Sequence, residues 1–336
     1  MNPVLWLALT ATAFSWLNQP SGSVASLRGV CAVSAGVVWA SGSGGTCLRT
    51  KDGGTTWGAL TVPGAAKLDF RGVVAFDDQT AFLMSAGPGA QSQVYRTSDG
   101  GAHWDRVLSD PDPDGFFDAL AFWDRKHGMV LGDPVAGRFV ILTTEDGGAR
   151  WQRQSPPPAL KGEGAFAASN SSLVLRRDGD RREAWFGTGG PGAARVFHSA
   201  DAGRTWSVAA TPLRNDSASA GIFSLAFADS KLGVAVGGDY SKPEEDQRNV
   251  AVTSDGGRTW VEPAGARPHG FRSAVTFAGD QKIWITTGTS GSDLSTDGGK
   301  TWAEFDSSAF NAIGGISGSA TWAVGPKGRI ARLAIR

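Results

Sequence analysis

A short box recurs six times along the 336-residue chain and limits its possible folds more than any other feature. The box has the form S/T-x-D-x-G-x-x-W, where x is any residue. Its copies are "TKDGGTTW" (50–57), "TSDGGAHW" (97–104), "TEDGGARW" (144–151), "SADAGRTW" (199–206), "TSDGGRTW" (253–260) and "STDGGKTW" (295–302). Successive box tryptophans lie 42 to 55 residues apart. A repeat of roughly 40–50 residues is typical of a β-propeller or a solenoid.

The letters of the box indicate a turn between two strands. Residues that favour strands flank each copy, as in a β-hairpin. In the second copy, Asp99 can accept backbone N–H bonds from the residues just after it. Gly100 and Gly101 can adopt a positive φ, and Trp104 can bury a large apolar surface. Since six near-identical copies cannot all be one active site, we interpret the boxes as structural turns.

The segments upstream of the boxes predict the rest of the repeat. Seven strands end in glycine, at 37–44, 80–87, 127–133, 183–190, 232–239, 282–291 and 320–328. Each comes after another apolar strand, at 27–33, 70–76, 116–122, 162–168, 221–227, 270–277 and 310–316. Four short strands per repeat of roughly 45 residues describe a propeller blade. The chain is therefore expected to be all-β, a seven-bladed β-propeller of four-stranded antiparallel blades.

The last repeat has no box, whereas the segment "FSWLNQPSG" (14–22) resembles the strand that comes directly after a box in the other repeats. We predict that it forms the outer strand of the seventh blade, which closes the ring and removes two exposed sheet edges. Residues 14–336 then form one domain.

Residues 1–13 are a separate segment, either a signal segment or a disordered tail. Their apolar run ends in Ala11-Thr12-Ala13 but lacks a positive n-region and is too short to span a bilayer.

Several classes of chemistry find no support in the sequence. The 32 basic and 32 acidic residues balance, so nucleic-acid binding has no electrostatic basis. The four histidines fall in different repeats, without ligands at zinc spacing. "DPDPDG" (110–115) imitates a calcium loop, but its twelfth position is Ala121 rather than Glu. We expect no metal and no cofactor. Cys31 and Cys47 lie two strands apart, about 9–10 Å, so two thiols are expected and the compartment is left open.

Propellers usually bind at the mouth of the ring, where inner strands begin and the glycine-ended strands finish. The boxes lie on the opposite rim. The inner-strand starts offer the candidates Arg28, Arg71, Asp118, Glu163, Arg272 and Asn311. The loops after the glycine-ended strands offer Asp133, Asp239, Tyr240, Lys242, Ser290 and Lys327. Arginines and acids around one channel form a pocket for an anionic or polar group, or they pair with each other across it; both interpretations stay open.

The boxes are similar to those of sialidases and other Asp-box (BNR-type) propellers. Four longer segments resemble the photosystem II stability/assembly-factor family, at 116–148, 237–243, 287–302 and 322–330. The resemblance covers roughly residues 15–336. It implies an exported propeller, periplasmic or secreted, that binds partner proteins, and in photosynthetic members helps to assemble a reaction-centre subunit. Because related chains also occur outside photosynthesis, the partner stays open.

The sequence leaves two function classes. The first is a non-catalytic, monomeric assembly scaffold that binds a protein partner, or a small anionic ligand, at the channel mouth. The second is a sialidase-like glycoside hydrolase, which needs a Tyr nucleophile and an arginine triad. Tyr240 is the only tyrosine expected near the mouth, because Tyr95 precedes a box. Arg28, Arg71 and Arg272 would have to imitate the triad.

Overall fold

The structure, a computed structural model, describes residues 14–335. The predictions for residues 1–13 lie outside this range. Among the described residues, no helix is long and apolar enough to cross a membrane. The two helices within this range are the short 3-10 turns η2 (Gly89–Gln91) and η3 (Pro326–Gly328).

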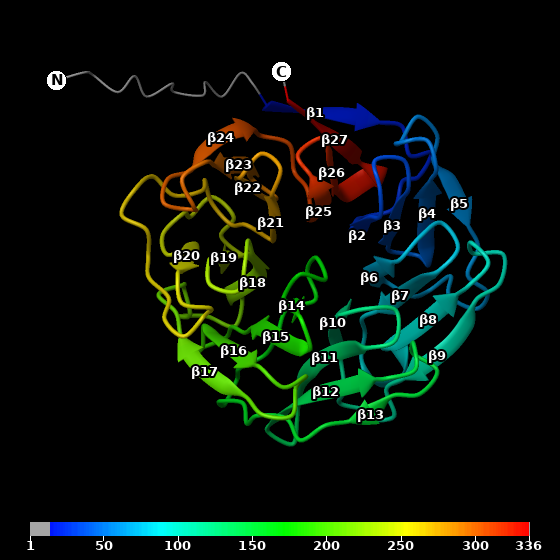
Figure 1. The fold of residues 1–336 in the computed structure, drawn as a ribbon, viewed down its shortest axis with the longest axis horizontal. Helices are drawn as coiled ribbons and strands as arrows, with labels where there is room; N and C mark the ends of the chain where they lie inside the picture. The colour runs from blue at the N-terminus through cyan, green and yellow to red at the C-terminus, as the bar shows by residue number, and fades with distance from the viewer. Residues whose placement is uncertain (1–13, 336) are drawn as a thin grey trace.

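Seven antiparallel sheets are arranged as a ring, which Figure 1 shows along the shortest axis of the molecule. The first three blades are consecutive four-stranded meanders, numbered from the inner strand outward. Blade one contains β2 (Leu27–Ala32), β3 (Val38–Gly42), β4 (Thr46–Thr50) and β5 (Gly58–Leu60). Blade two contains β6 (Phe70–Ala75), β7 (Ala81–Ser85), β8 (Gln93–Thr97) and β9 (Asp105–Ser109). Blade three contains β10 (Phe117–Phe122), β11 (Gly128–Val135), β12 (Arg138–Thr144) and β13 (Gln152–Arg153).

The remaining blades keep the same order. Blade four contains β14 (Leu173–Asp178), β15 (Arg181–Gly187), β16 (Arg195–Ser199) and β17 (Ser207–Ala210). Blade five contains β18 (Ala220–Phe227), β19 (Gly233–Asp239) and β20 (Val250–Thr253), with the single bridge Val252↔Val261 in place of an outer strand. Blade six contains β21 (Ala274–Ala278), β22 (Ile283–Gly288), β23 (Gly291–Ser295) and β24 (Ala303–Asp306). Blade seven contains β25 (Ala312–Ser317), β26 (Ala320–Val324), β27 (Ile330–Ile335) and β1 (Phe14–Gln19). The predicted seven-bladed propeller is confirmed.

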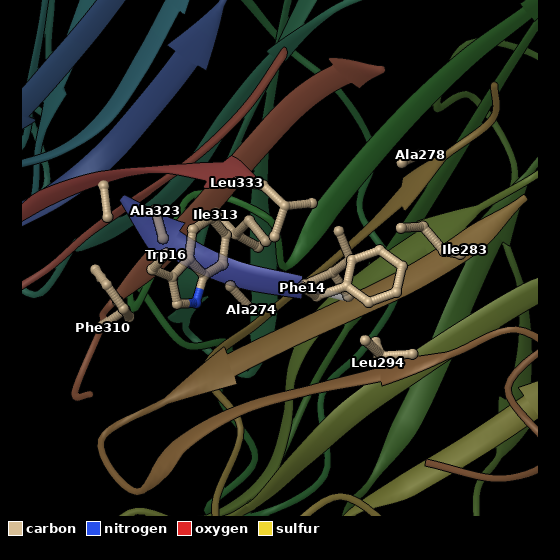
Figure 2. Close-up of a cluster of buried hydrophobic side chains, with 12 residues drawn as sticks. Phe14, Trp16, Ala274, Ala278, Ile283, Leu294, Phe310, Ile313, Ala323 and Leu333 are labelled. Atoms are coloured by element: carbon tan, nitrogen blue, oxygen red, sulfur yellow. The ribbon is translucent and has the colours of Figure 1, made fainter. Parts of the chain in front are cut away.

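The predicted ring closure is also confirmed. Strand β1 pairs with β27 in antiparallel register, from Phe14↔Ile335 to Gln19↔Ile330, and Figure 1 shows these strands side by side in blue and red. Figure 2 shows Phe14 and Trp16 within a buried cluster that also draws on blades six and seven. The indole N–H of Trp16 donates to Ser292 Oγ of blade six at 3.0 Å. The N-terminal strand therefore joins the first and last parts of the ring.

The boxes are turns between the third and fourth strands, as predicted. In the first box, Thr50 Oγ1 donates to Asp52 Oδ1 and accepts the amide of Gly54 at 2.9 Å. The same two bonds recur in the other five boxes. In four boxes a further amide donates to the turn between the first two strands of the same blade, as Gly53 does to Gly36, and in blade four Ala202 donates to Arg182 at the start of β15. Each of these five boxes is thus tied to the first hairpin of its own blade.

The expected inner strand at 162–168 is wrong. Blade four takes its inner strand from Leu173–Asp178, and residues 162–168 belong to the long connection between β13 and β14. Residues 179 and 180 form the turn between β14 and β15, directly after the pair Asp178↔Arg181. The expectation for the cysteines is confirmed, since Cys31 and Cys47 are both free thiols.

Candidate functional site

A cavity of about 960 Å³ lies at the end of the ring where the inner strands begin. Seven of the residues predicted from the sequence line it: Arg28, Arg71, Asp118, Asp133, Glu163, Tyr240 and Asn311. The structure brings these seven together from different blades. Their role in binding a partner stays a prediction.

A repeated β-bulge explains how three of these side chains reach the cavity. In blade one, Leu27 pairs with Gly42 and Gly29 pairs with Ser41, so Arg28 lies between them without a partner. Arg71 in blade two and Asp118 in blade three occupy the same unpaired position. So does Phe223 in blade five. A bulge bends the strand and redirects the extra side chain, and all four bulge residues line the cavity.

The connection before β14 crosses the ring; we call residues 159–172 the strap. Asn170 bonds both the amide and the carbonyl of Leu120 in blade three, at 2.8 and 2.9 Å. Ser169 Oγ donates to the carbonyl of Ser273 beside blade six, and Ser171 Oγ meets Ser224 Oγ of blade five. The carbonyl of Ala167 accepts from Arg71 of blade two at 3.1 Å. Since the strap contacts four blades and lines the cavity, it forms the cavity floor.

Close packing against the strap needs a glycine in blade two. A Cβ on Gly72 would lie 2.5 Å from Asn170 Oδ1, closer than real Cβ contacts. Asn170 itself has a φ of 64°, in the left-handed region that Asn tolerates better than most residues. The sequence around both positions is therefore suited to a segment held tightly inside the ring.

Arg28 and Arg71 form the cationic wall of the cavity. Arg71 Nε donates to Asp69 Oδ2 at 2.8 Å. Within residues 14–335, Arg28 Nε has no hydrogen-bond partner. Burial lowers the pKa of Arg28, and the neighbouring charge of Arg71 lowers it further, against the effect of Asp69. Two adjacent guanidinium groups with a single carboxylate between them favour an incoming anionic group.

Asp118 and Asp133 form the acidic wall next to it. Burial raises the pKa of Asp118 well above its ordinary value, and the charge of Asp133 adds to this effect while Arg71 opposes it. Burial also raises the pKa of Asp133 to about 6, although the amide of Ala165 donates to its Oδ1 at 2.9 Å. Within residues 14–335, Asp118 Oδ2 has no hydrogen-bond partner, and Asp133 accepts from the amide of Ala165. Burial with so few donors disfavours the charged form of both carboxyl groups.

Aromatic side chains form the third wall. Phe166 of the strap stacks on Phe223 with ring centroids 3.9 Å apart. Phe271 and Tyr240 meet Phe223 edge-on, at 4.7 and 6.1 Å. All four residues line the cavity, and Tyr240 is 56% exposed. The cavity therefore offers cationic, acidic and aromatic surfaces in turn around its circumference.

The remaining predicted residues do not offer free groups to the cavity. Glu163 lines it but accepts from Arg195, Thr188 and the amide of Leu160, and so fastens the strap to blade four. Asn311 donates to the carbonyl of Leu27 and links blade seven to blade one. Asp239, Ser290, Lys242 and Lys327 are not among the cavity-lining residues. Asp239 accepts from Ser217 and Ser241, and Lys242 lies 3.7 Å from Glu245.

Arg272 is the clearest departure from the sequence-based expectation. It precedes β21 and is fully buried, with Nε donating to Asp293 Oδ2 at 2.7 Å and Nη1 to Ser290 Oγ at 2.8 Å. Arg28 and Arg71 line the cavity, but Arg272 does not. The arginine triad that a sialidase-like site needs is therefore not assembled.

Sequence reasoning predicted Tyr240 at the cavity but missed the strap and the three phenylalanines of the aromatic wall, Phe166, Phe223 and Phe271. The sequence did contain a signal for Phe223. When "GIFSLAF" is aligned with "FFDALAF", Phe223 takes the position that Asp118 has in its own repeat. The expectation considered only polar side chains at that position. The strap carried no such signal, because its apolar pattern is also that of a strand.

Comparison with known proteins supports the fold. No protein-family model and no curated protein matches the chain. A solved structure of YCF48 bound to D1 peptide is 17% identical, with a TM-score of 0.65, covering 96% of this chain and 97% of the other. YCF48 from Cyanidioschyzon merolae is 19% identical, with a TM-score of 0.61, covering 95% and 98%. The structure of U3-55K is 11% identical, with a TM-score of 0.67, covering 97% and 99%. The TM-scores over nearly the whole chain establish a shared propeller fold, whereas identities this low assign no functional residue.

Proposed function

We propose that this propeller is a non-catalytic binding scaffold that holds a segment of a protein partner in the cavity. The observation that carries the proposal is the cavity itself, in which a cationic wall and an aromatic wall face one space of about 960 Å³. Binding sites combine apolar surface with a few placed polar groups in this way. A partner segment with an acidic side chain or terminus beside an apolar residue fits these walls.

The structurally similar YCF48 bound to D1 peptide supports a peptide as the class of ligand. The aromatic wall would hold apolar side chains of such a segment, and Arg28 and Arg71 would hold its carboxylate. Arginine suits this role because its charge persists at any physiological pH and its donors match a carboxylate in pairs.

The test is a comparison of two double variants in photo-crosslinking. A photoreactive residue replaces Leu160, which lines the cavity and is 48% exposed. Crosslinked partners are then captured from the envelope fraction of the native host. We expect Arg28→Ala/Arg71→Ala to reduce capture of a defined partner at least several-fold, and the remaining capture to depend less on salt.

The matched control is Arg106→Ala/Arg150→Ala, which removes two exposed arginines outside the cavity. This variant should capture the same partner as the unmodified protein. Equal capture by both double variants would contradict the proposal, as would a crosslinked product that does not contain protein.

A further inference from the structure

Asp118 is a buried carboxyl group that the proposed anion-binding role does not use. Its side chain lines the cavity, yet the residue is only 1% exposed. Within residues 14–335, its Oδ2 has no hydrogen-bond partner. A buried polar atom without a partner is costly, so Oδ2 of Asp118 calls for an explanation, and a bound cation is one.

Asp133 lies beside it and is held in a defined position. The amide of Ala165 in the strap donates to its Oδ1. A Cβ on Gly164 would come within 2.8 Å of the same oxygen, so glycine there lets the strap approach the carboxyl group. The strap thus holds Asp133 through its Oδ1, close enough to Asp118 for the charge of one carboxyl group to act on the other.

The charges around this pair are not balanced. Asp118 is influenced by Asp133 and Arg71, and Arg28 by Arg71 and Asp69. Two arginines against three carboxylates leave one formal negative charge. The other ionisable groups of the cavity do not change this sum, because Asp114 offsets Lys161 and Glu163 pairs with Arg195.

We propose that Asp118 and Asp133 form a subsite for the ammonium group of a lysine side chain from the bound partner. This proposal deepens the scaffold function and rests on it. An ammonium has three N–H donors and one positive charge, which suit two carboxylates that, within residues 14–335, receive one hydrogen bond between them, from the amide of Ala165. The deep position of Asp118 requires a charge on a slender stem, and the four-carbon stem of lysine provides it. Among residues 14–335, no group of three acidic, His or Cys side chains gathers as a metal site would require.

Binding of an ammonium should release protons. The raised pKa of Asp118 and the value of about 6 for the pKa of Asp133 favour the protonated forms near and below pH 6. A cation favours the ionised forms and draws both pKa values down. Affinity should therefore rise as the pH increases through about 6, and fewer protons should be released at higher pH.

The experiment uses blocked pentapeptides with a central lysine and two glycines on each side. Calorimetric titration of the full-length protein at pH 7.5 should show saturable binding of this peptide, and none with norleucine in place of lysine. Asp118→Asn and Asp133→Asn should each weaken binding at least tenfold. Asp114→Asn is the matched control, since Asp114 also lines the cavity but is exposed, and it should bind as the unmodified protein does.

Equal binding of the lysine and norleucine peptides would overturn the proposal, as would unchanged affinity in both Asp118→Asn and Asp133→Asn. Binding of n-butylammonium as tightly as the peptide would overturn the assignment to a partner's lysine and indicate a small free amine. The peptides carry no carboxylate, so they do not test the cationic wall. If the peptide titration fails but photo-crosslinking captures a protein partner, the scaffold function stands and the ammonium subsite is wrong. If the lysine peptide binds but no protein partner is captured, the ammonium subsite stands and the scaffold function is wrong.

Discussion

At the scale of single residues, the hydroxyl of each box does more for stability than the aspartate that recurs beside it. Thr253 is buried, and its Oγ1 accepts the buried amide of Gly257 at 2.9 Å. Asp255 accepts from the amide and hydroxyl of Thr259 at exposed positions, where water can replace it. A buried donor that loses its acceptor costs more than an exposed one.

Thr253→Val is therefore expected to lower the free energy of unfolding by roughly 1–3 kcal/mol, and Asp255→Ala by less. Neither variant changes the two glycines of the turn. Urea denaturation monitored by tryptophan fluorescence measures the difference. A larger loss in Asp255→Ala would mean that the aspartate, and not the hydroxyl, organises the turn.

The box aspartates predict loss of stability in acid. Hydrogen bonds from Thr56 lower the pKa of Asp52 to about 2. In Asp255 burial raises the pKa, but the bonds from Thr259 and Thr253 outweigh it and bring the value to about 2. A carboxyl with a lowered folded-state pKa stabilises the fold above its unfolded value of about 3.9 and loses this effect as the pH falls toward 2. Thermal unfolding between about pH 4 and pH 2 should show this loss, and Asp52→Asn should reduce it.

The raised pKa of Asp133 in the cavity makes stability depend on pH in the opposite direction. The folded-state pKa of Asp133 is raised to about 6, so the folded state holds its proton more tightly than the unfolded chain. Its contribution is present at low pH and is lost as the pH rises from about 4 to about 6. Asp133→Asn should remove this decline. The melting temperature of the variant should therefore rise relative to that of the unmodified protein as the pH increases from about 4 to about 6. Parallel melting curves of the two proteins would contradict the raised pKa.

At the scale of elements, the strap determines whether the cavity has a floor. Asn170 joins it to β10 through two bonds to Leu120. Asn170→Gly tolerates the positive φ but removes both bonds, whereas Asn170→Asp keeps the acceptor for the Leu120 amide. Hydrogen exchange at Leu120 should accelerate strongly in Asn170→Gly and much less in Asn170→Asp. Unchanged exchange in Asn170→Gly would show that the strap is held by its serines alone.

Most elements were predictable because six of the seven repeats carry two independent signals, a box and a glycine-ended strand, and the seventh carries the glycine-ended strand. The strap was not, because residues 162–168 alternate small and apolar residues as an inner strand does. What decides their structure is non-local: Leu173–Asp178 pairs with β15 and leaves the preceding segment free to cross the ring. For the same reason Glu163, which was expected at the start of an inner strand, lies in the strap instead.

The site residues were predictable where the position of a residue in the repeat determines which way its side chain points. Arg28, Arg71 and Asp118 share one bulge position, so their common orientation results from the repeat. Arg272 aligns with them in sequence, but β21 begins only at Ala274, and Asp293 of β23 binds the guanidinium inside blade six. The segment around Arg272 gives no indication of a partner on β23, which β22 separates from β21.

At the scale of the whole molecule, the ring depends on joining its two ends through β1. This strand supplies all six backbone pairings to β27 and places Phe14 and Trp16 between blades six and seven. Trp16 also contacts Phe305 and Phe310, with ring centroids 5.7 and 5.4 Å apart. Without β1, the edge of β27 would be exposed and the contact between the two blades would lose its aromatic centre.

Deleting residues 1–20 is therefore expected to lower the melting temperature markedly and to promote aggregation through the exposed edge. Trp16→Ala keeps the strand but removes its largest buried side chain, at a cost of roughly 3–5 kcal/mol. Deleting residues 1–13 leaves β1 whole and is the matched control, since its melting temperature should equal that of the full chain. Differential scanning calorimetry with light scattering separates the three variants. Because the strand contributes both pairing and packing, the longer deletion should be less stable than Trp16→Ala. If both deletions melt together, the seventh blade does not need the N-terminal strand, and the ring must be held closed by contacts between blades one and seven alone.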